Sequence, residues 1–326
     1  MVCYPGEREP AIVHTLKRRD EAAGISAYAA RSDGFTRAPL VDASLHMTLD
    51  LARLEPGGHV CRHLHSFEES VYVLSGRPVL RIEDRSIRLG PASGASVPVG
   101  VQHEWCVDGE SPAAWIEMTS PCRRGEAEQP DTFFVGEATP LNAEPVNVDV
   151  RDPRSRYFFQ FADGQLDVER SRSRGASVDE AAVSGSMATA LLAYSGISVK
   201  MLVDQRLGAH LHTMFMVEYQ PGGVAHLHDH PFEESYYLLE GEIDVVADGV
   251  EFTMLPGDAL WTAVGCVHGF RNTSGKCVRW LETAAPQPPA HHSYRFNRDW
   301  EYLAAQLAGA PLEQTIASKG ARWIES

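Results

Sequence analysis

Residues 63–76 read HLHSFEESVYVLSG, and residues 228–241 read HDHPFEESYYLLEG. Both stretches contain two histidines, the run Phe-Glu-Glu-Ser and a closing glycine, at an offset of 228 − 63 = 165 residues. The same offset relates further pairs: Pro56 and Pro221, His103 and His268, Trp115 and Trp280, and Glu117 and Glu282. A constant offset over such a span predicts that one fold is used twice in this chain.

Each repeat has the composition of short β-strands. Runs such as 70–74 and 214–219 are rich in aromatic and β-branched residues. Turn-forming stretches separate them, including Pro56-Gly-Gly58 and Pro256-Gly-Asp258. Many short strands with frequent turns are typical of antiparallel sandwiches and jelly-roll barrels. We therefore predict an all-β protein with two tandem barrels, which we expect to be separate folds.

The repeat also predicts how the chain is divided into domains. We expect an N-terminal extension (1–41), a first barrel (42–122), a linker with strands of its own (123–206), a second barrel (207–288) and a C-terminal tail (289–326). The tail should contain one short helix, because Trp300, Leu303, Ala304 and Leu307 have helical spacing behind Asn297 as a candidate cap.

Charge and composition limit the choice of partners. The formal net charge of the 326 residues is −15, and a field of that sign repels phosphate backbones and acidic membrane surfaces. We therefore expect no nucleic-acid or membrane partner. The N-terminal residues MVCYPGEREP lack the apolar run of a secretory signal, and the six scattered cysteines form no Cys-x-x-Cys pair. We expect a cytoplasmic homo-oligomer, most simply a dimer, that acts on a small molecule.

Three histidines and one glutamate in each repeat have the spacing of metal ligands. Side chains at i and i+2 of a strand lie on the same face, so the two histidines of each His-x-His pair can converge on one point. The glutamate follows four residues later, and the third histidine lies 34 residues after it (103 − 69 = 34; 268 − 234 = 34), which leaves room for a hairpin. The candidate ligands are His63, His65, Glu69 and His103 in the first repeat, and His228, His230, Glu234 and His268 in the second.

Mixed nitrogen and oxygen ligands suit manganese, iron, nickel, copper or zinc better than calcium or magnesium. We predict a divalent transition metal (iron, manganese, nickel or zinc), with up to two ions per chain. Four protein ligands leave coordination positions open on a five- or six-coordinate ion, whereas a structural zinc site is closed. The predicted site is therefore one where a substrate can bind.

The motifs around these ligands resemble those of the cupins. The first cupin motif, G-x5-H-x-H-x3-E-x6-G, is matched from Gly57 to Gly76 and again from Gly222 to Gly241. The second motif, G-x5-P-x-G-x2-H-x3-N, is matched in part by each repeat, and the departures, such as Val107 in place of Asn, spare the ligands. The resemblance implies a bicupin, with two small jelly-roll barrels that each enclose a metal ion.

Strand parity also predicts where other residues near the motifs point. Tyr236 has the inward parity of Glu234, and His226 has that of His228, so both are candidate catalytic residues of the second repeat. Val71 and Cys61 occupy the equivalent positions of the first repeat, so its cavity should be less polar. Two further glutamates, Glu68 and Glu233, should point to the opposite face of their strands, either outward or into hairpin packing.

The resemblance leaves three functions open. The favoured one is a metal-dependent oxidoreductase of the dioxygenase type, which chelates a small oxygenated metabolite on the metal. The second is a non-redox aminohydrolase or isomerase, similar to the ureidoglycine aminohydrolases, although those end their ligand set in a glutamine that this chain lacks. The third is a binding module, either a small-molecule sensor or a storage-type cupin. Undamaged ligand sets favour an enzyme, and neither the substrate nor the metal can be identified from the sequence.

Overall fold

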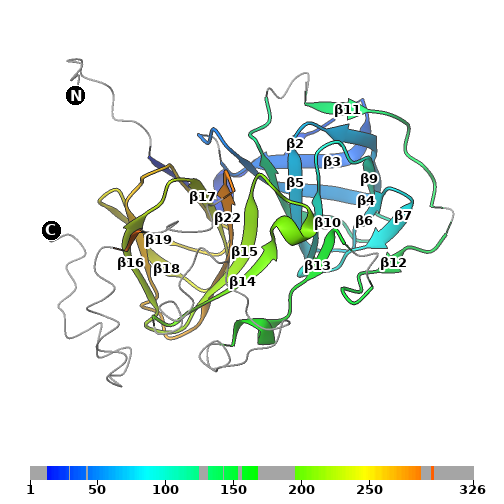
Figure 1. The fold of residues 1–326 in the computed structure, drawn as a ribbon. Helices are drawn as coiled ribbons and strands as arrows, with labels where there is room; N and C mark the ends of the chain where they lie inside the picture. The colour runs from blue at the N-terminus through cyan, green and yellow to red at the C-terminus, as the bar shows by residue number, and fades with distance from the viewer. Residues whose placement is uncertain are drawn as a thin grey trace, which may run out of the picture.

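The protein is described by a computed structural model that contains two β-barrels (Figure 1). It describes residues 13–287, except 29, 42, 125–130, 142, 153–155 and 168–194, and also the backbone strand Arg295–Phe296. In this part of the chain the structure has strands and short 3-10 helices: η1 (Arg19–Glu21), η2 (Asp163–Leu166) and η3 (Gln205–Leu207). No helix among the described residues is long and apolar enough to span a membrane.

Barrel 1 is a twelve-stranded sheet. Its strands are β2 (Ile25–Ser26), β3 (Ser32–Pro39), β4 (Thr48–His65), β5 (Glu68–Ser75), β6 (Val79–Ile82), β7 (Arg85–Arg88), β8 (Ser93–Val97), β9 (His103–Cys106), β10 (Ala113–Ser120), β11 (Thr132–Phe134), β12 (Val146–Asn147) and β13 (Phe158–Gln160). Alternate residues of these strands point inward and form an apolar core that includes Leu54, Val73 and Trp115.

Barrel 2 is built from two sheets. Its strands are β1 (His14–Lys17), β14 (Ile197–Val203), β15 (Thr213–Tyr219), β16 (Val224–Asp229), β17 (Glu233–Glu240), β18 (Ile243–Ala247), β19 (Val250–Met254), β20 (Ala259–Thr262), β21 (His268–Arg271), β22 (Val278–Ala285) and β23 (Arg295–Phe296). Strands β15 and β16 correspond to the two halves of β4, and the turn between them contains Gly222 at φ 78°, a conformation that favours glycine.

The registers of the two barrels confirm the repeat. Glu117 of β10 pairs with Asp50 on one side and with Val71 on the other. Glu282 of β22 pairs with Phe215 and Tyr236, which are the residues 165 positions after Asp50 and Val71. The structure therefore confirms two tandem jelly-roll barrels. The domain boundaries and the homodimer stay predictions, and the predicted C-terminal helix lies outside the described residues.

The expectation that the barrels are separate folds is wrong in one respect, because the strand that precedes barrel 1 in the chain belongs to a sheet of barrel 2. Strand β1, which precedes barrel 1 in the chain, pairs with β20 of barrel 2, from His14↔Thr262 to Lys17↔Ala259. Strand β13, which precedes barrel 2, pairs with β8 of barrel 1. Barrel 2 thus includes a strand from the N-terminal end of the chain, whereas all the described strands of barrel 1 lie within residues 25–160.

A shared core and two buried glutamates also join the barrels. The apolar cluster between them contains side chains from both halves, among them Met118 and Leu281. Glu68 of barrel 1 accepts hydrogen bonds from the backbone N–H groups of His210 (2.8 Å) and Leu211 (2.9 Å), just before β15. Its side chain does point away from the interior of barrel 1, as expected, but it is buried against barrel 2 rather than exposed to solvent.

Glu233 of barrel 2 makes the matching contacts with barrel 1. It accepts a hydrogen bond from the Ser44 hydroxyl and from the N–H groups of Leu45 (3.2 Å) and His46 (3.3 Å), just before β4. Trp261 also donates to it, at 3.3 Å. Glu68 and Glu233 directly precede the candidate ligands Glu69 and Glu234. Each of them therefore connects its own candidate site to the segment that leads into the opposite barrel.

Candidate metal centres

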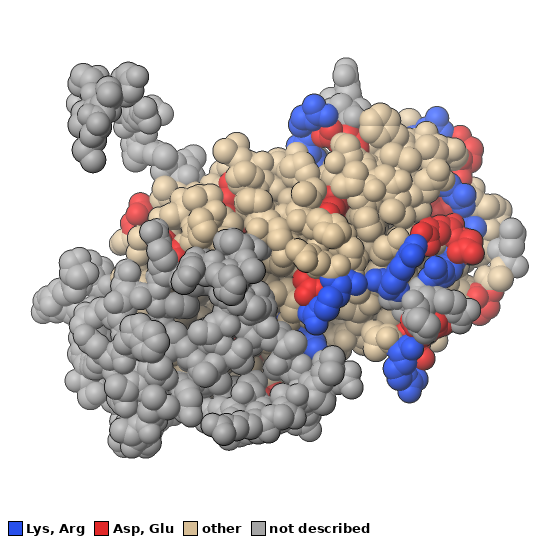
Figure 2. All heavy atoms as spheres, viewed as in Figure 1, with Lys and Arg blue, Asp and Glu red and all other residues tan. Residues whose placement is uncertain are grey.

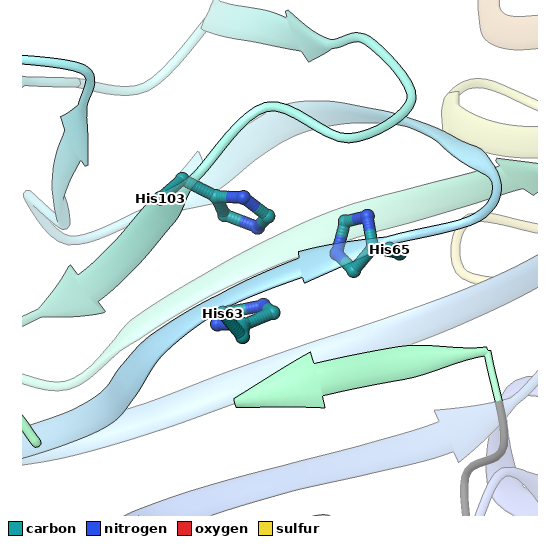
Figure 3. Close-up of side chains that lie close together, drawn as sticks. All are labelled: His63, His65 and His103. Atoms are coloured by element: carbon teal, nitrogen blue, oxygen red, sulfur yellow. The ribbon is translucent and has the colours of Figure 1, made fainter. Parts of the chain in front are cut away.

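Three imidazoles converge in barrel 1 (Figure 3). His63 and His65 lie at the end of β4, and His103 begins β9, where it pairs with His63 across the sheet. Their ring centroids are 4.1 Å (His63–His103), 4.6 Å (His65–His103) and 5.1 Å (His63–His65) apart. One nitrogen from each ring lies within 4.8 Å of the others, and all three residues are buried. This is a nitrogen set that a transition-metal ion could occupy.

Backbone carbonyls orient the histidines. The Nδ1 atoms of His63 and His103 lie 2.7 Å from the Cys61 carbonyl and 3.0 Å from the Val101 carbonyl. An Nδ1–H that donates to a carbonyl leaves the Nε2 lone pair facing inward, as metal coordination requires. The same contact recurs in barrel 2, in the pairs His228 with His226 (2.7 Å), His230 with Phe232 (2.6 Å) and His268 with Cys266 (3.0 Å).

Glu69 lies at the edge of the barrel 1 set. Its Oε2 is 3.2 Å from Nε2 of His65, while its buried Oε1 has no hydrogen-bond partner among the described residues. The buried Nε2 of His103 likewise has none there. Buried polar atoms are normally satisfied, so an inward lone pair and an unused carboxylate oxygen fit a bound cation.

In barrel 2 the closest donor group is His230, Glu234 and His268. Oε2 of Glu234 lies 2.9 Å from Nε2 of His230 and 3.8 Å from Nε2 of His268. His228 joins from the side, since its ring centroid is 4.4 Å from that of His268 and 6.3 Å from that of His230. The structure therefore gathers all four predicted ligands of each barrel, with Glu69 and His228 at the margins.

Burial keeps most of these imidazoles neutral, which is the form that binds metal. It lowers the pKa of His63, His65, His103 and His268 below the ordinary value, and it lowers the pKa of His228 to about 4. His230 differs, because the neighbouring Glu234 outweighs burial and raises its pKa. For Glu234 burial acts to raise the pKa, but the interaction with His230 prevails and lowers it to about 2.

Tyr236 lies within this barrel 2 group. Its hydroxyl donates a hydrogen bond to Glu234 Oε2 and lies 2.9 Å from Nε2 of His268. The inward parity predicted for Tyr236 is thus correct. His226 contributes its backbone carbonyl, which orients His228. The side chain of His226 is not part of the donor group of barrel 2.

The expectation of a less polar barrel 1 is wrong. Its interior contains the buried charged residues Arg37, Asp50 and Glu117. Arg123, which follows β10, forms ion pairs with the carboxylates of Asp50 and Glu117. Arg37 lies 2.6 Å from Glu117. Sequence reasoning missed this cluster because Arg37 lies in the N-terminal extension, outside the repeat. The alternation of Phe35 and Arg37 in β3 was the available signal, since both residues point to one face.

Comparisons with known proteins agree with this architecture. The family described as "Cupin domain" matches residues 50–119 and 215–284. Among solved structures, the Lactobacillus farciminis oxalate decarboxylase formate complex is similar to this chain with a TM-score of 0.58 and 16% identity, covering 94% of each chain. The Bacillus subtilis oxalate decarboxylase studied for its Mn(II) centres has a TM-score of 0.59 and 15% identity, covering 95% of this chain and 88% of its own.

A third similar structure belongs to another reaction class. It is a mutant salicylate 1,2-dioxygenase from Pseudoaminobacter salicylatoxidans in complex with gentisate, with a TM-score of 0.56 and 12% identity. The similarity covers 84% of this chain and 82% of that one. No curated protein matches the chain. At these identities the likeness establishes the fold alone and does not identify the reaction of this chain.

Proposed function

Because the chain is a bicupin of the cupin superfamily, we propose that it is a metal-dependent enzyme of the dioxygenase type that acts on a small oxygenated metabolite. Two donor sets of the kind that binds a divalent transition metal support this proposal. Similar folds include a salicylate 1,2-dioxygenase and oxalate decarboxylases. By their names, these proteins act on salicylate and on oxalate, which are both small oxygenated molecules.

The proposed ligands are the eight residues predicted from the sequence. His63, His65, His103 and Glu69 would hold one ion, and His228, His230, His268 and Glu234 would hold the other. The ion would serve as a Lewis acid or redox centre with open positions for chelation. The protein contributes neutral imidazoles in a set orientation and a buried interior that excludes water.

The Tyr236 hydroxyl is the feature that favours catalysis in barrel 2. It bridges Glu234 and His268 inside the donor group, so its proton lies next to the position that a substrate oxygen would occupy. A phenol held there can donate a hydrogen bond to negative charge that develops on the substrate, or it can move a proton to it. Val71 at the equivalent position of barrel 1 offers no such group.

The same phenol and carboxylate also favour one alternative. A hydroxyl that shares a hydrogen bond with Glu234 is a proton-transfer device, and aminohydrolases and isomerases need proton transfer without any oxidant. Oxygen consumption separates the two functions, since the dioxygenase consumes one O₂ per turnover and the non-redox enzyme consumes none.

The test begins with metal analysis of protein purified under nitrogen, followed by an oxygen electrode and a panel of small hydroxy and carboxylic acids. We expect up to two metal ions per chain and substrate-dependent oxygen uptake. The variant Glu234→Gln should abolish turnover, whereas Glu69→Gln should retain most of it. Turnover without oxygen uptake would support the non-redox alternative. A protein that takes up no transition metal under any loading condition would contradict both functions.

A further inference from the structure

Two nitrogen donors inside barrel 1 are buried without a hydrogen-bond partner among the described residues. They are Nε of Arg37 and Nε1 of Trp115. Arg37 is 6% exposed and Trp115 is fully buried. Leaving a buried donor unsatisfied costs about 1–3 kcal/mol, and more for a charged group. Two such donors inside one barrel are what a ligand with an acceptor atom would satisfy.

The two side chains that carry these donors lie on the same face of the sheet. Arg37 and Trp115 both pair with Ala52 of β4, one from β3 and one from β10. Residues directly opposite each other across a sheet point to the same face, so the small Ala52 side chain separates a guanidinium from an indole. Phe35 also lies against both, with its ring 4.9 Å from Cζ of Arg37 and stacked on Trp115 at 5.8 Å.

Arg37 lies close to the candidate metal set. Cζ of Arg37 lies 4.5 Å from the centre of the Tyr28 ring, and that ring is 5.7 Å from the ring of His63. Phe134 closes the same side, 5.4 Å from His63 and 5.2 Å from Tyr28. The guanidinium is close enough that, after burial, its charge helps to lower the pKa of the three candidate histidine ligands.

Barrel 2 lacks this arrangement at the equivalent positions. Val199 takes the place of Arg37, since it pairs with Val217, the residue 165 positions after Ala52. Phe215 takes the place of Asp50. Trp280, the counterpart of Trp115, donates to Glu282 at 2.8 Å and so has its acceptor within the protein. The two unsatisfied donors are therefore a difference between barrels that otherwise share a fold.

We propose that barrel 1 binds a small organic monocarboxylate between Arg37, Trp115 and its metal ion. The inference rests on the proposed metal in barrel 1, and it assigns that barrel a ligand class of its own. The carboxylate would accept the N–H groups of Arg37 and Trp115, and its apolar part would pack against Tyr28 and Phe134. Arg37 forms a planar fork of donors that matches a carboxylate.

Charge balance favours a monoanion. A divalent ion together with Arg37 and Arg123 supplies four positive charges, and the carboxylates of Asp50, Glu69 and Glu117 supply three negative charges. One monocarboxylate neutralises the difference. A phosphate dianion would leave an uncompensated negative charge in a buried chamber, which is unfavourable.

Carboxylate binding can be followed with Mn(II)-loaded protein and ¹³C-labelled acetate, because Mn(II) broadens the signal of a ligand bound beside it. The variants are Arg37→Gln, Trp115→Phe and the double variant R37Q/E117Q, which removes the ion pair without leaving Glu117 unneutralised by Arg37. The matched control is Arg53→Gln, an arginine on the exposed face of β4. Acetamide serves as the neutral comparison and inorganic phosphate as the dianion.

We expect saturable acetate broadening in the wild type, weakened on the order of 10- to 100-fold by Arg37→Gln and by the double variant. Trp115→Phe should weaken it by several-fold, and Arg53→Gln should leave it unchanged, all at unaltered manganese content. Equal acetate affinity in the wild type and R37Q/E117Q, or equal binding of acetamide, would overturn the proposal. Phosphate binding in preference to acetate would also overturn it. A wild type that takes up no manganese would instead contradict the proposed metal-dependent function.

Discussion

Replacing Glu68 by alanine tests whether the barrels are one cooperative unit. Glu68 is 3% exposed and lies at the boundary between the barrels. It accepts hydrogen bonds from the backbone N–H groups of His210 and Leu211, and its Oε2 lies 3.2 Å from Nδ1 of His212. His212 in turn lies 2.7 Å from the hydroxyl of Ser70. Glu68→Ala would remove the acceptor of two part-buried backbone donors that lie just before β15.

The expected loss follows from these contacts. A hydrogen bond to a charged group contributes about 1.5–3 kcal/mol, so two of them, allowing for relaxation, give a loss of about 3–5 kcal/mol. The entropy of unfolding is about 2.1 cal/mol/K per residue, which is roughly 0.7 kcal/mol/K for this chain. The predicted fall in Tm is therefore about 4–7 °C.

The effect of Glu68 should also depend on pH. Burial acts to raise its pKa, but the contacts with His212 and the two N–H groups prevail and lower it below 4.5. A carboxyl group whose folded-state pKa is lowered stabilises the protein fully above its unfolded value and loses that contribution as pH falls through the folded value. The difference in Tm between the wild type and Glu68→Ala should be complete near neutral pH and shrink on acidification below about 4.5.

Differential scanning calorimetry measures both quantities, with Glu251→Ala on the exposed face of β19 as the control. Because strand β1 belongs to barrel 2 and the barrels share an apolar cluster, we expect a single transition in the wild type and a single, lower one in Glu68→Ala. Two independent transitions in the wild type, or a Glu68→Ala shift no larger than that of the control, would show that the barrels unfold separately or that Glu68 does not join them.

Three further predictions concern the candidate sites. Tyr236→Phe should lower turnover by about 10²- to 10⁴-fold with little change in KM, and steady-state kinetics with unchanged turnover would exclude the phenol from catalysis. Elemental analysis of His103→Ala and of His268→Ala should each find about one metal ion per folded chain instead of two, while loss of both ions from either variant would contradict separate sites. Burial lowers the pKa of His228 to about 4, so the metal-free protein should lose stability as pH falls from about 6.5 to about 4. Denaturant titrations should find this slope reduced in His228→Gln, and an equal slope in both would show that His228 is not the titrating group.

The visible outer surface of barrel 1 carries charges of both signs. Figure 2 shows acidic and basic side chains intermixed over the barrel 1 end of the molecule. Several of them are paired, such as Arg88 with Asp108 and Glu144. Exposed pairs of this kind contribute little to stability. The strong electrostatic effects of this protein lie inside the barrels and between them.

The convergence of the candidate ligands could be predicted because the information that places them is local. The spacing of His63 and His65 sets a common strand face, and the repeat at 165 residues confirms the pattern by an independent copy. Tyr236 followed from the same parity rule. The sites of the two barrels differ in detail, since Glu69 and His228 lie at the margins of their groups, and that difference depends on packing that no spacing rule describes.

The duplication, the all-β character and the two histidine-rich clusters of this chain could be predicted from its residues alone, because strand alternation is a local pattern and the repeat is a direct match between two stretches of sequence. How the halves are joined is visible only in the folded protein. The pairing of β1 with β20 connects residues about 245 positions apart, and Arg37 enters barrel 1 from a segment outside the repeat. Contacts of this kind leave no periodic signal, since they depend on which sheet edge and which buried charge remain to be satisfied after the barrels have closed.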